Sequence, residues 1–343
     1  MNTVIQRLLF LAAVGFTSLT ANVAEAATVL KFSTWLPPGH FVQKKILDEW
    51  ADDVAEATDG RVEVQMTASA LGPPQRQFDI VRQGIADISW GVPAYTPGRF
   101  VTAEVLDLPF LGNSAEALSV AQWRAQQRFF SSAGEYKDVK LLALHAQPPG
   151  RIYTDTKPLG DVSDLRGLKI RVLTPATAGM IKALGGAPVS AASSKTYELL
   201  SRGIIDGTFF SSDAIPQFKL MDYVHHEMSV DGGFYNACFF LIMNKTKWAS
   251  LSADDRQAID KLSGEAFAKR IGRIWDEQAL ESERLLEEAG VEKVLVQGAA
   301  LESLRQQIDG GEQDWIEAVS KLGVDGEGAI KFIREQAASY EAE

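Results

Sequence analysis

Polar and aromatic side chains gather in five short segments that follow, or lie on, predicted strands. The segments are residues 35–40, 93–100, 148–151, 169–172 and 208–213. In open α/β sheets ligands bind in the crevice outside the carboxyl ends of the strands, so these segments are predicted to meet at a binding site. Each segment also has a simpler interpretation when taken alone. Arg151 and Arg171 fit solvated arginines or weak surface pairs, and Trp35 and Phe210 fit core residues.

Motifs for catalysis are missing from the sequence. It contains no Gly-x-Ser-x-Gly elbow, no phosphate-binding loop and no Gly-x-Gly-x-x-Gly after a strand. His225-His226-Glu227 lacks the i, i+4 histidine pair of zinc proteases, and adjacent side chains on a helix or strand point apart. We interpret this tripeptide as a polar cluster on the surface. We therefore predict a protein that is not an enzyme and has neither a cofactor nor a metal site.

The N-terminus predicts export. Arg7 is followed by an apolar run at residues 8–14 and by the small-x-small sequence Ala24-Glu25-Ala26, the order typical of a secretory signal. The run is shorter than the roughly 20 residues that span a bilayer. We expect residues 1–26 to be removed and the mature chain to start near Ala27. The single cysteine, Cys238, allows no internal disulfide and is interpreted as a small buried hydrophobe.

Charge and length limit the partners and the architecture. The formal net charge of −11 argues against nucleic acid, because phosphate binding needs clustered lysines and arginines. The 343 residues exceed the roughly 250–300 at which single cores tend to split. Short apolar strands alternate with helical stretches, which predicts an α/β protein with two lobes.

Residues 252–289 form a longer helical stretch that Ser252 would cap and Gly290 would end. One unbroken helix of that size would be roughly 55 Å long, which exceeds the width of a small lobe. Either the stretch bends at Gly264 or Gly272, or it runs across both lobes. The pattern leaves both alternatives open.

Several blocks of sequence, in order, resemble the solute-binding proteins of TRAP transporters (the DctP type). The central blocks are residues 167–172, 185–188 and 203–207, and further matches are residues 71–72, 84–87, 108–110 and 243–252. The resemblance runs from about Val29 to about Ala289. It implies a periplasmic protein with two open α/β lobes, a ligand cleft between them, crossing strands and a long spanning helix. It also implies a small organic acid as ligand, a membrane permease as partner, and a monomer.

The resemblance assigns a role to the two arginines. Arg171 matches the arginine that forms a two-pronged pair with the ligand carboxylate, which suits the planar guanidinium. Arg151 matches a second arginine, which either holds another carboxylate or braces Arg171. Sialic-acid-binding members carry a glutamate and an asparagine where this chain has Val92 and Phe210, and a phenylalanine where it has Ser193. Apolar side chains thus replace polar groups that read a sugar's hydroxyls, so a sugar acid is not expected. An aromatic or 2-hydroxy/2-oxo monocarboxylate is favoured over a dicarboxylate.

These inferences define a site and a division of the chain. The predicted ligand-binding residues are Arg171, Arg151, Phe210, Trp35, His40, Tyr95, Val92, Ser211 and Asp213. The first lobe is expected to comprise residues 27–149 and 237–275, and the second residues 150–236 and 276–343. The alternative function is a secreted sensor of the same fold that hands its ligand to a signalling receptor.

Overall fold

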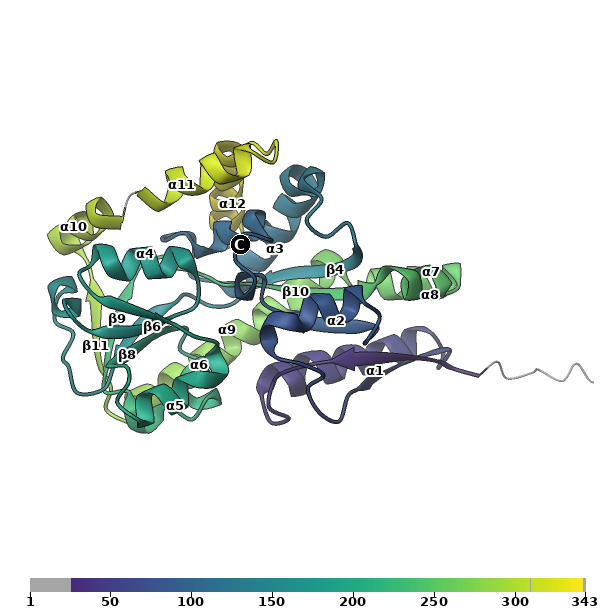
Figure 1. Cartoon of the computed structure of the whole chain (residues 1–343), viewed down its shortest axis with the longest axis horizontal. Coiled ribbons are helices and arrows are strands. Elements are labelled where there is room, and N and C mark those ends of the chain that lie inside the picture. The colour runs from purple at the N-terminus through teal and green to yellow at the C-terminus, as the bar shows by residue number, and fades with distance from the viewer. Residues whose placement is uncertain (1–25, 309, 342–343) are drawn as a thin grey trace, which may run out of the picture.

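The computed structural model describes residues 26–308 and 310–341, so the predicted signal segment lies outside the described residues apart from Ala26. The described chain folds into two α/β lobes, each built on its own sheet (Figure 1). The two-lobed α/β prediction is therefore confirmed. In the described part, no helix has the length and apolarity that crossing a membrane would require.

The sheet of the first lobe has the order β2-β1-β3-β10-β4. Its strands are β1 (Thr28–Ser33), β2 (Val62–Met66), β3 (Ile88–Gly91), β4 (Val139–Ala146) and β10 (Cys238–Asn244). β1 is parallel to β2 and β3, whereas β10 is antiparallel to β3 and β4. The main helices of this lobe are α1 (Asp48–Ala57), α2 (Gln77–Arg82) and α3 (Ala115–Ala125). As predicted, Cys238 is buried.

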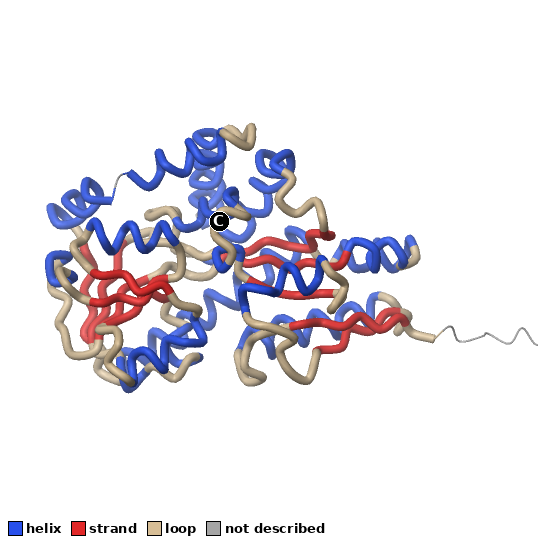
Figure 2. Tube along the Cα trace, in the orientation of Figure 1, coloured by secondary structure: helices blue, strands red, loops and turns tan. Residues whose placement is uncertain are grey.

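The sheet of the second lobe has the order β11-β9-β5-β8-β6-β7 (Figure 2). Its strands are β5 (Arg151–Thr154), β6 (Lys169–Val172), β7 (Ala187–Ser190), β8 (Gly207–Phe210), β9 (His226–Val230) and β11 (Glu292–Val296). The helices that follow these strands are α4 (Pro175–Ala183), α5 (Thr196–Ser201) and α6 (Ala214–Gln217). α4 begins as predicted: the Thr174 hydroxyl accepts a hydrogen bond from the Thr177 amide, and Pro175 is the first helical residue.

Two extended segments connect the lobes, one from β4 to β5 and the other from β9 to β10. They lie side by side, because the Gly150 amide donates to the Tyr235 carbonyl at 2.7 Å and the Gln147 amide donates to the Ala237 carbonyl at 3.2 Å. Gly150 allows this approach: a Cβ there would lie 2.0 Å from Cε1 of Tyr235. The predicted crossing strands are thus present, and their contact depends on the missing side chain of one glycine.

The stretch 252–289 combines the two alternatives left open by its pattern. It is divided into α8 (Ala253–Lys261), which follows α7 (Lys245–Ser250), and α9 (Gly264–Glu288). Gly264 has a positive φ of 61°, a conformation that favours glycine and marks the break. α9 then crosses both lobes: it packs on α3, and Leu286 at its far end joins a core cluster of the second lobe (Figure 1).

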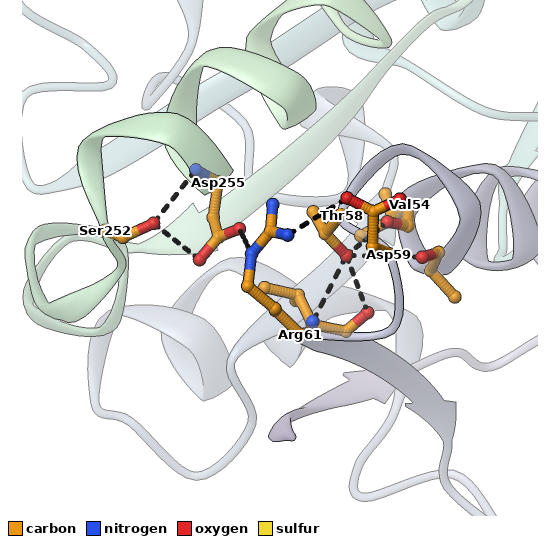
Figure 3. A network of polar contacts seen from close by, with 8 residues as sticks. Val54, Thr58, Asp59, Arg61, Ser252 and Asp255 are labelled. Atoms are coloured by element: carbon orange, nitrogen blue, oxygen red, sulfur yellow. Dashed lines mark hydrogen bonds and ion pairs between the residues drawn. The ribbon is translucent and has the colours of Figure 1, made fainter. Parts of the chain in front are cut away.

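A network of polar contacts ties the start of α8 to the turn after α1 (Figure 3). Arg61 Nε donates to Asp255 Oδ1 at 2.9 Å, and the Ser252 hydroxyl donates to Asp255 Oδ2 at 2.6 Å. The Asp255 amide donates back to the Ser252 hydroxyl, so Ser252 is the N-cap that the sequence predicted. Because Arg61 is largely exposed, we expect this network to orient α8 more than to stabilise the fold.

The C-terminal helices lead from the second lobe back to the first (Figure 1). They are α10 (Gly298–Ile308), α11 (Gly310–Ser320) and α12 (Gly326–Glu341). α10 contacts α4, whereas α12 packs on α3, and Ile330 and Ile333 share a core cluster with Leu118. The assignment of all residues 276–343 to the second lobe is therefore wrong for α12, because its apolar face is buried against the first lobe.

Candidate functional site

A cavity lies between the lobes, lined by residues of both. Both lobes, the crossing segments and α9 contribute to its wall. The aromatic lining residues are Trp35, Trp90, Tyr95, Phe210, Phe218, Tyr235, Phe239 and Trp275. The others are Leu36, His40, Val92, Gln147, Leu173, Ser193, Ser211, Asp213 and Ala214. The wall is mostly apolar, with a few polar groups that come from segments distant in sequence.

Ring contacts connect this wall into an unbroken series. The centroid distances are 5.9 Å for Tyr95–Trp35, 5.8 Å for Trp35–Trp90, 4.8 Å for Trp90–Phe239, 5.4 Å for Phe239–Trp275, 4.8 Å for Trp275–Phe41, 5.1 Å for Phe41–His40, 5.6 Å for His40–Phe218 and 5.7 Å for Phe218–Phe210. Such stacked and edge-on pairs restrain one another. A flat ligand would therefore meet a rigid aromatic surface.

Arg171 closes the series. Its guanidinium carbon lies 4.3 Å from the ring centroid of Phe210, and its Nη2 donates to the Ser193 hydroxyl at 3.2 Å. The Ser193 hydroxyl also accepts a hydrogen bond from the Tyr95 hydroxyl at 3.1 Å. Arg171 is not itself a lining residue, but its guanidinium contacts two of them, Phe210 and Ser193, and Ser193 joins it to Tyr95.

The Arg171 guanidinium is fully buried without a counter-charge among the described residues. It also donates to two neutral carbonyls, from Nε to Ala191 at 2.9 Å and from Nη1 to Phe209 at 3.4 Å. Burial lowers the pKa of Arg171, but guanidinium stays protonated in proteins. The interpretation as a solvated arginine is wrong, because the side chain is 0% exposed and contacts Phe210 and Ser193. A buried cation without a partner favours an anionic ligand.

Arg151 has a different environment, because two carboxylates neutralise it. Its Nη1 donates to Glu227 at 2.8 Å, and its Nη2 pairs with Glu283 of α9. It is not part of the cavity wall, and in the described structure no hydrogen bond joins it to Arg171. The structure thus does not bring the two predicted arginines together, and Arg151 connects β5 and β9 to the spanning helix.

The tripeptide at residues 225–227 is only partly a surface cluster. His225 is exposed and lies 3.0 Å from Asp155, as interpreted from the sequence. Glu227, however, is 1% exposed. Glu227 and Met228 of β9 are both buried, and Glu227 pairs with Arg151. No group of three or more potential ligands that could hold a metal occurs among the described residues.

Asp213 brings a second ionisable group into the wall. It is 2% exposed, and its Oδ1 has no hydrogen-bond partner among the described residues. Burial raises the pKa of Asp213 to about 7, an effect that a hydrogen bond from Ser211 and the charge of Arg151 reduce. Among the described residues, Asp213 forms no ion pair with Arg171.

The remaining predicted residues all line the cavity: Phe210, Trp35, His40, Tyr95, Val92 and Ser211. Burial lowers the pKa of His40 to about 4, so its ring is neutral at pH 7. Sequence reasoning did not select Trp90, Gln147, Phe239 or Trp275. Trp275 lies on a helix, at a spacing that is equally typical of a core residue. Only its neighbours in the folded protein show that it lines a cavity. Gln147 directly precedes the predicted site segment 148–151, and this position is the one sequence feature that could have indicated its role.

Three buried hydrogen-bond donors of the wall also lack a partner in the described structure. They are the Nε1 atoms of Trp35 and Trp275 and the Nε2 atom of Gln147. Unpaired buried donors are costly, and a ligand oxygen would satisfy them. The site thus offers one cation, three free donors and one free acceptor around an aromatic cavity. These groups can hold and orient a ligand.

Comparisons with known proteins agree with a binding site of this kind. The family model described as bacterial extracellular solute-binding protein, family 7, matches residues 32–316. The outer membrane transporter protein TsaT of Comamonas testosteroni is 32% identical over 322 residues, which cover 93% of this chain and 94% of that protein.

Two solved structures are similar over nearly their whole length. A TRAP periplasmic solute-binding protein of Bordetella bronchiseptica, with bound (R)-mandelate and (S)-mandelate, is 35% identical, with a TM-score of 0.88 and coverage of 91% of this chain and 99% of that chain. A marine metagenome TRAP solute-binding protein specific for aromatic acid ligands, in complex with 3-hydroxybenzoate, is 33% identical. Its TM-score is 0.86, and the match covers 92% of this chain and 99% of that chain.

Proposed function

The chain belongs to the bacterial extracellular solute-binding proteins of family 7, and on this premise we propose that it captures an aromatic or 2-hydroxy/2-oxo monocarboxylate. Proteins of this family are the substrate-binding receptors of TRAP transporters and are not enzymes. In the proposed cycle, the secreted protein binds the acid between its lobes and delivers it to the permease subunits in the membrane.

The buried, uncompensated charge of Arg171 is the observation that carries this proposal. A carboxylate accepts two parallel hydrogen bonds from a guanidinium, and such charge-assisted bonds are the stronger ones. In the structure, the partners of Arg171 are neutral oxygens, so the bound acid would supply the missing negative charge. A neutral sugar would leave the cation uncompensated.

The shape and chemistry of the wall support an aromatic body for the ligand. The ring series from Tyr95 to Phe210 presents flat apolar surfaces. Two similar solved structures, each about one-third identical, bind mandelate or 3-hydroxybenzoate. Those ligands are aromatic monocarboxylates, and mandelate is also a 2-hydroxy acid.

The state of Arg151 supports a monocarboxylate over a dicarboxylate. A second carboxylate would need a second available cation. Arg151 is already paired with Glu227 and Glu283, and His40 is neutral because burial lowers its pKa to about 4. A second carboxylate in this cavity would therefore be buried without compensation, which is unfavourable.

The experiment is a ligand panel on the purified protein without residues 1–26, unfolded and refolded first to remove any acid retained from the cells. Thermal unfolding is followed with benzoate, mandelate and phenylpyruvate, and with succinate and malate as the competing class. At 100 times its dissociation constant, a ligand adds about 2.7 kcal/mol to the free energy of unfolding. We expect a shift with at least one of the aromatic acids and none with succinate or malate.

Two outcomes contradict the proposal. A shift with the dicarboxylates alone would overturn the assigned ligand class. Delivery is tested separately, by measuring uptake of the radiolabelled acid into cells that express the matching permease, with and without this protein. Binding without any effect on uptake would favour the sensor alternative.

A further inference from the structure

Asp213 has an unpaired hydrogen-bond acceptor, which a ligand with a hydrogen-bond donor would satisfy. Asp213 lines the cavity, is 2% exposed, and has an Oδ1 atom without a partner in the described structure. A buried acceptor that loses its water without gaining a donor weakens binding. A ligand that only fills the cavity would leave this atom unpaired. A ligand with a hydrogen-bond donor in reach of Asp213 would satisfy it.

Asp213 lines the cavity, whereas Arg171 lies behind the wall in contact with the lining residues Phe210 and Ser193. No ion pair joins them among the described residues, and Arg171 instead adjoins Ser193, Tyr95 and Phe210. Tyr235 feels both charges, since Arg171 lowers its pKa and Asp213 raises it, against a larger effect of burial. Tyr235 also lines the cavity. Because an ionised carboxylate has no hydrogen to donate, the donor that Asp213 requires must belong to a second group of the ligand.

The free donors of the wall define the kind of group that fits near Asp213. The Nε1 atoms of Trp35 and Trp275 and the Nε2 atom of Gln147 all need an acceptor. A hydroxyl donates one hydrogen bond and accepts others, so it can serve Asp213 and one of these donors together. An ammonium group has no acceptor and would leave the donors unpaired.

From this arrangement we infer that the ligand is a ring-hydroxylated aromatic monocarboxylate, and that Asp213 is the residue that selects the ring hydroxyl. The carboxylate pairs with Arg171, and the ring hydroxyl donates to Asp213. The inference rests on the proposed function, because it specifies which aromatic acid the same cavity takes.

The test compares acids that differ in one group, by isothermal titration calorimetry on the refolded protein. The acids are benzoate, 3-hydroxybenzoate, 4-hydroxybenzoate and the methyl ethers of the two hydroxy acids. We expect the better hydroxy acid to bind roughly 10- to 100-fold more tightly than benzoate, the range expected when one buried acceptor gains or lacks its donor. Its methyl ether, which keeps the oxygen and removes the donor, should bind no better than benzoate.

Two variants assign the selectivity to Asp213. Asp213→Leu has nearly the same shape without the acceptor, and the ratio of affinities for the hydroxy acid and benzoate should fall to within about threefold of one. Ser193→Ala is the matched control at the carboxylate end: it should weaken both acids and leave their ratio unchanged. If Asp213→Leu does not fold, Asp213→Asn replaces it and should reduce the ratio.

The outcomes separate this inference from the proposed function. If benzoate binds but the ratio is near one in the unaltered protein, ring-hydroxyl selection is wrong while the aromatic-acid site stands. A high ratio that persists in the Asp213 variant would also overturn the role of Asp213. If no aromatic acid binds, the proposed function fails and the inference fails with it.

Discussion

Replacing Arg171 with methionine should abolish ligand binding while the protein remains folded. Methionine keeps much of the side-chain length and apolar character but removes the guanidinium. The substitution therefore removes the one uncompensated buried cation that adjoins the cavity in the described structure. Arg171→Lys keeps the charge but not the planar fork, so its effect on affinity should be intermediate.

The size of the two effects follows from the contacts of Arg171. Its bonds to Ala191, Phe209 and Ser193 are each worth about 1 kcal/mol net. Their loss is opposed by relief from burying an unpaired charge, so we expect the free energy of unfolding to change by less than about 2 kcal/mol. Two charge-assisted bonds to a carboxylate are worth about 3–6 kcal/mol together, which corresponds to a roughly 10²- to 10⁴-fold loss of affinity.

The assay combines calorimetric titration with benzoate and urea unfolding without ligand. Arg151→Gln is the matched control, because it also removes a buried guanidinium but at a site outside the cavity. Loss of Arg151 leaves Glu227 buried without its partner, so this variant should lose about 3–5 kcal/mol of stability. Its affinity for benzoate should stay within about threefold of the unaltered protein, since Glu227 and Glu283 already neutralise Arg151.

Three results would refute the reasoning. Affinity within about tenfold in Arg171→Met would show that the carboxylate pairs elsewhere. Equal loss of affinity in both arginine variants would show that Arg151 reaches the ligand. A variant of Arg171 that unfolds without ligand would show that the guanidinium is structural.

Two further predictions concern the scaffold. Gly150→Ala should lower the free energy of unfolding in urea by about 1–3 kcal/mol, because a Cβ there would lie 2.0 Å from Tyr235 Cε1. Gly39→Ala is the control, since nothing lies within 4 Å of its Cβ, and equal stabilities would contradict the crossing geometry. Burial lowers the pKa of His145 to about 3 from 6.5, so between these pH values the unfolded chain binds a proton that the folded chain does not, and stability falls as pH falls. Between pH 7 and pH 5 the free energy of unfolding should fall by about 2 kcal/mol less in His145→Gln than in the unaltered protein. Equal decreases in the two proteins would refute this prediction.

Local signals in the sequence were enough for the order of the elements. Thr174 and Pro175 mark the start of α4, and the alternation of Val62 and Val64 marks β2, because caps and periodicity depend on neighbouring residues alone. The two-lobed division also followed from strand–helix alternation and length. The break in the stretch 252–289 could not be placed from the sequence, since Gly264 and Gly272 have the same helix propensity. Gly264 takes a positive φ, whereas a Cβ on Gly272 would lie 2.4 Å from the Cα of Glu116 on α3.

The site depended on contacts between residues distant in the chain. Pattern alone misplaced Arg171 in solvent, and only the family resemblance selected it. Its side chain is buried by residues distant in sequence: the ring of Phe210, the carbonyl of Ala191 and the hydroxyl of Ser193. Arg151 matched the same family pattern, yet Glu227 and Glu283 neutralise it from β9 and α9. The sequence by itself determined which elements form and which residues could bind an anion. Tertiary structure decided which arginine stays uncompensated, because a charge is neutralised by whatever lies within a few ångströms of it, and the spacing of residues along the chain does not encode that distance.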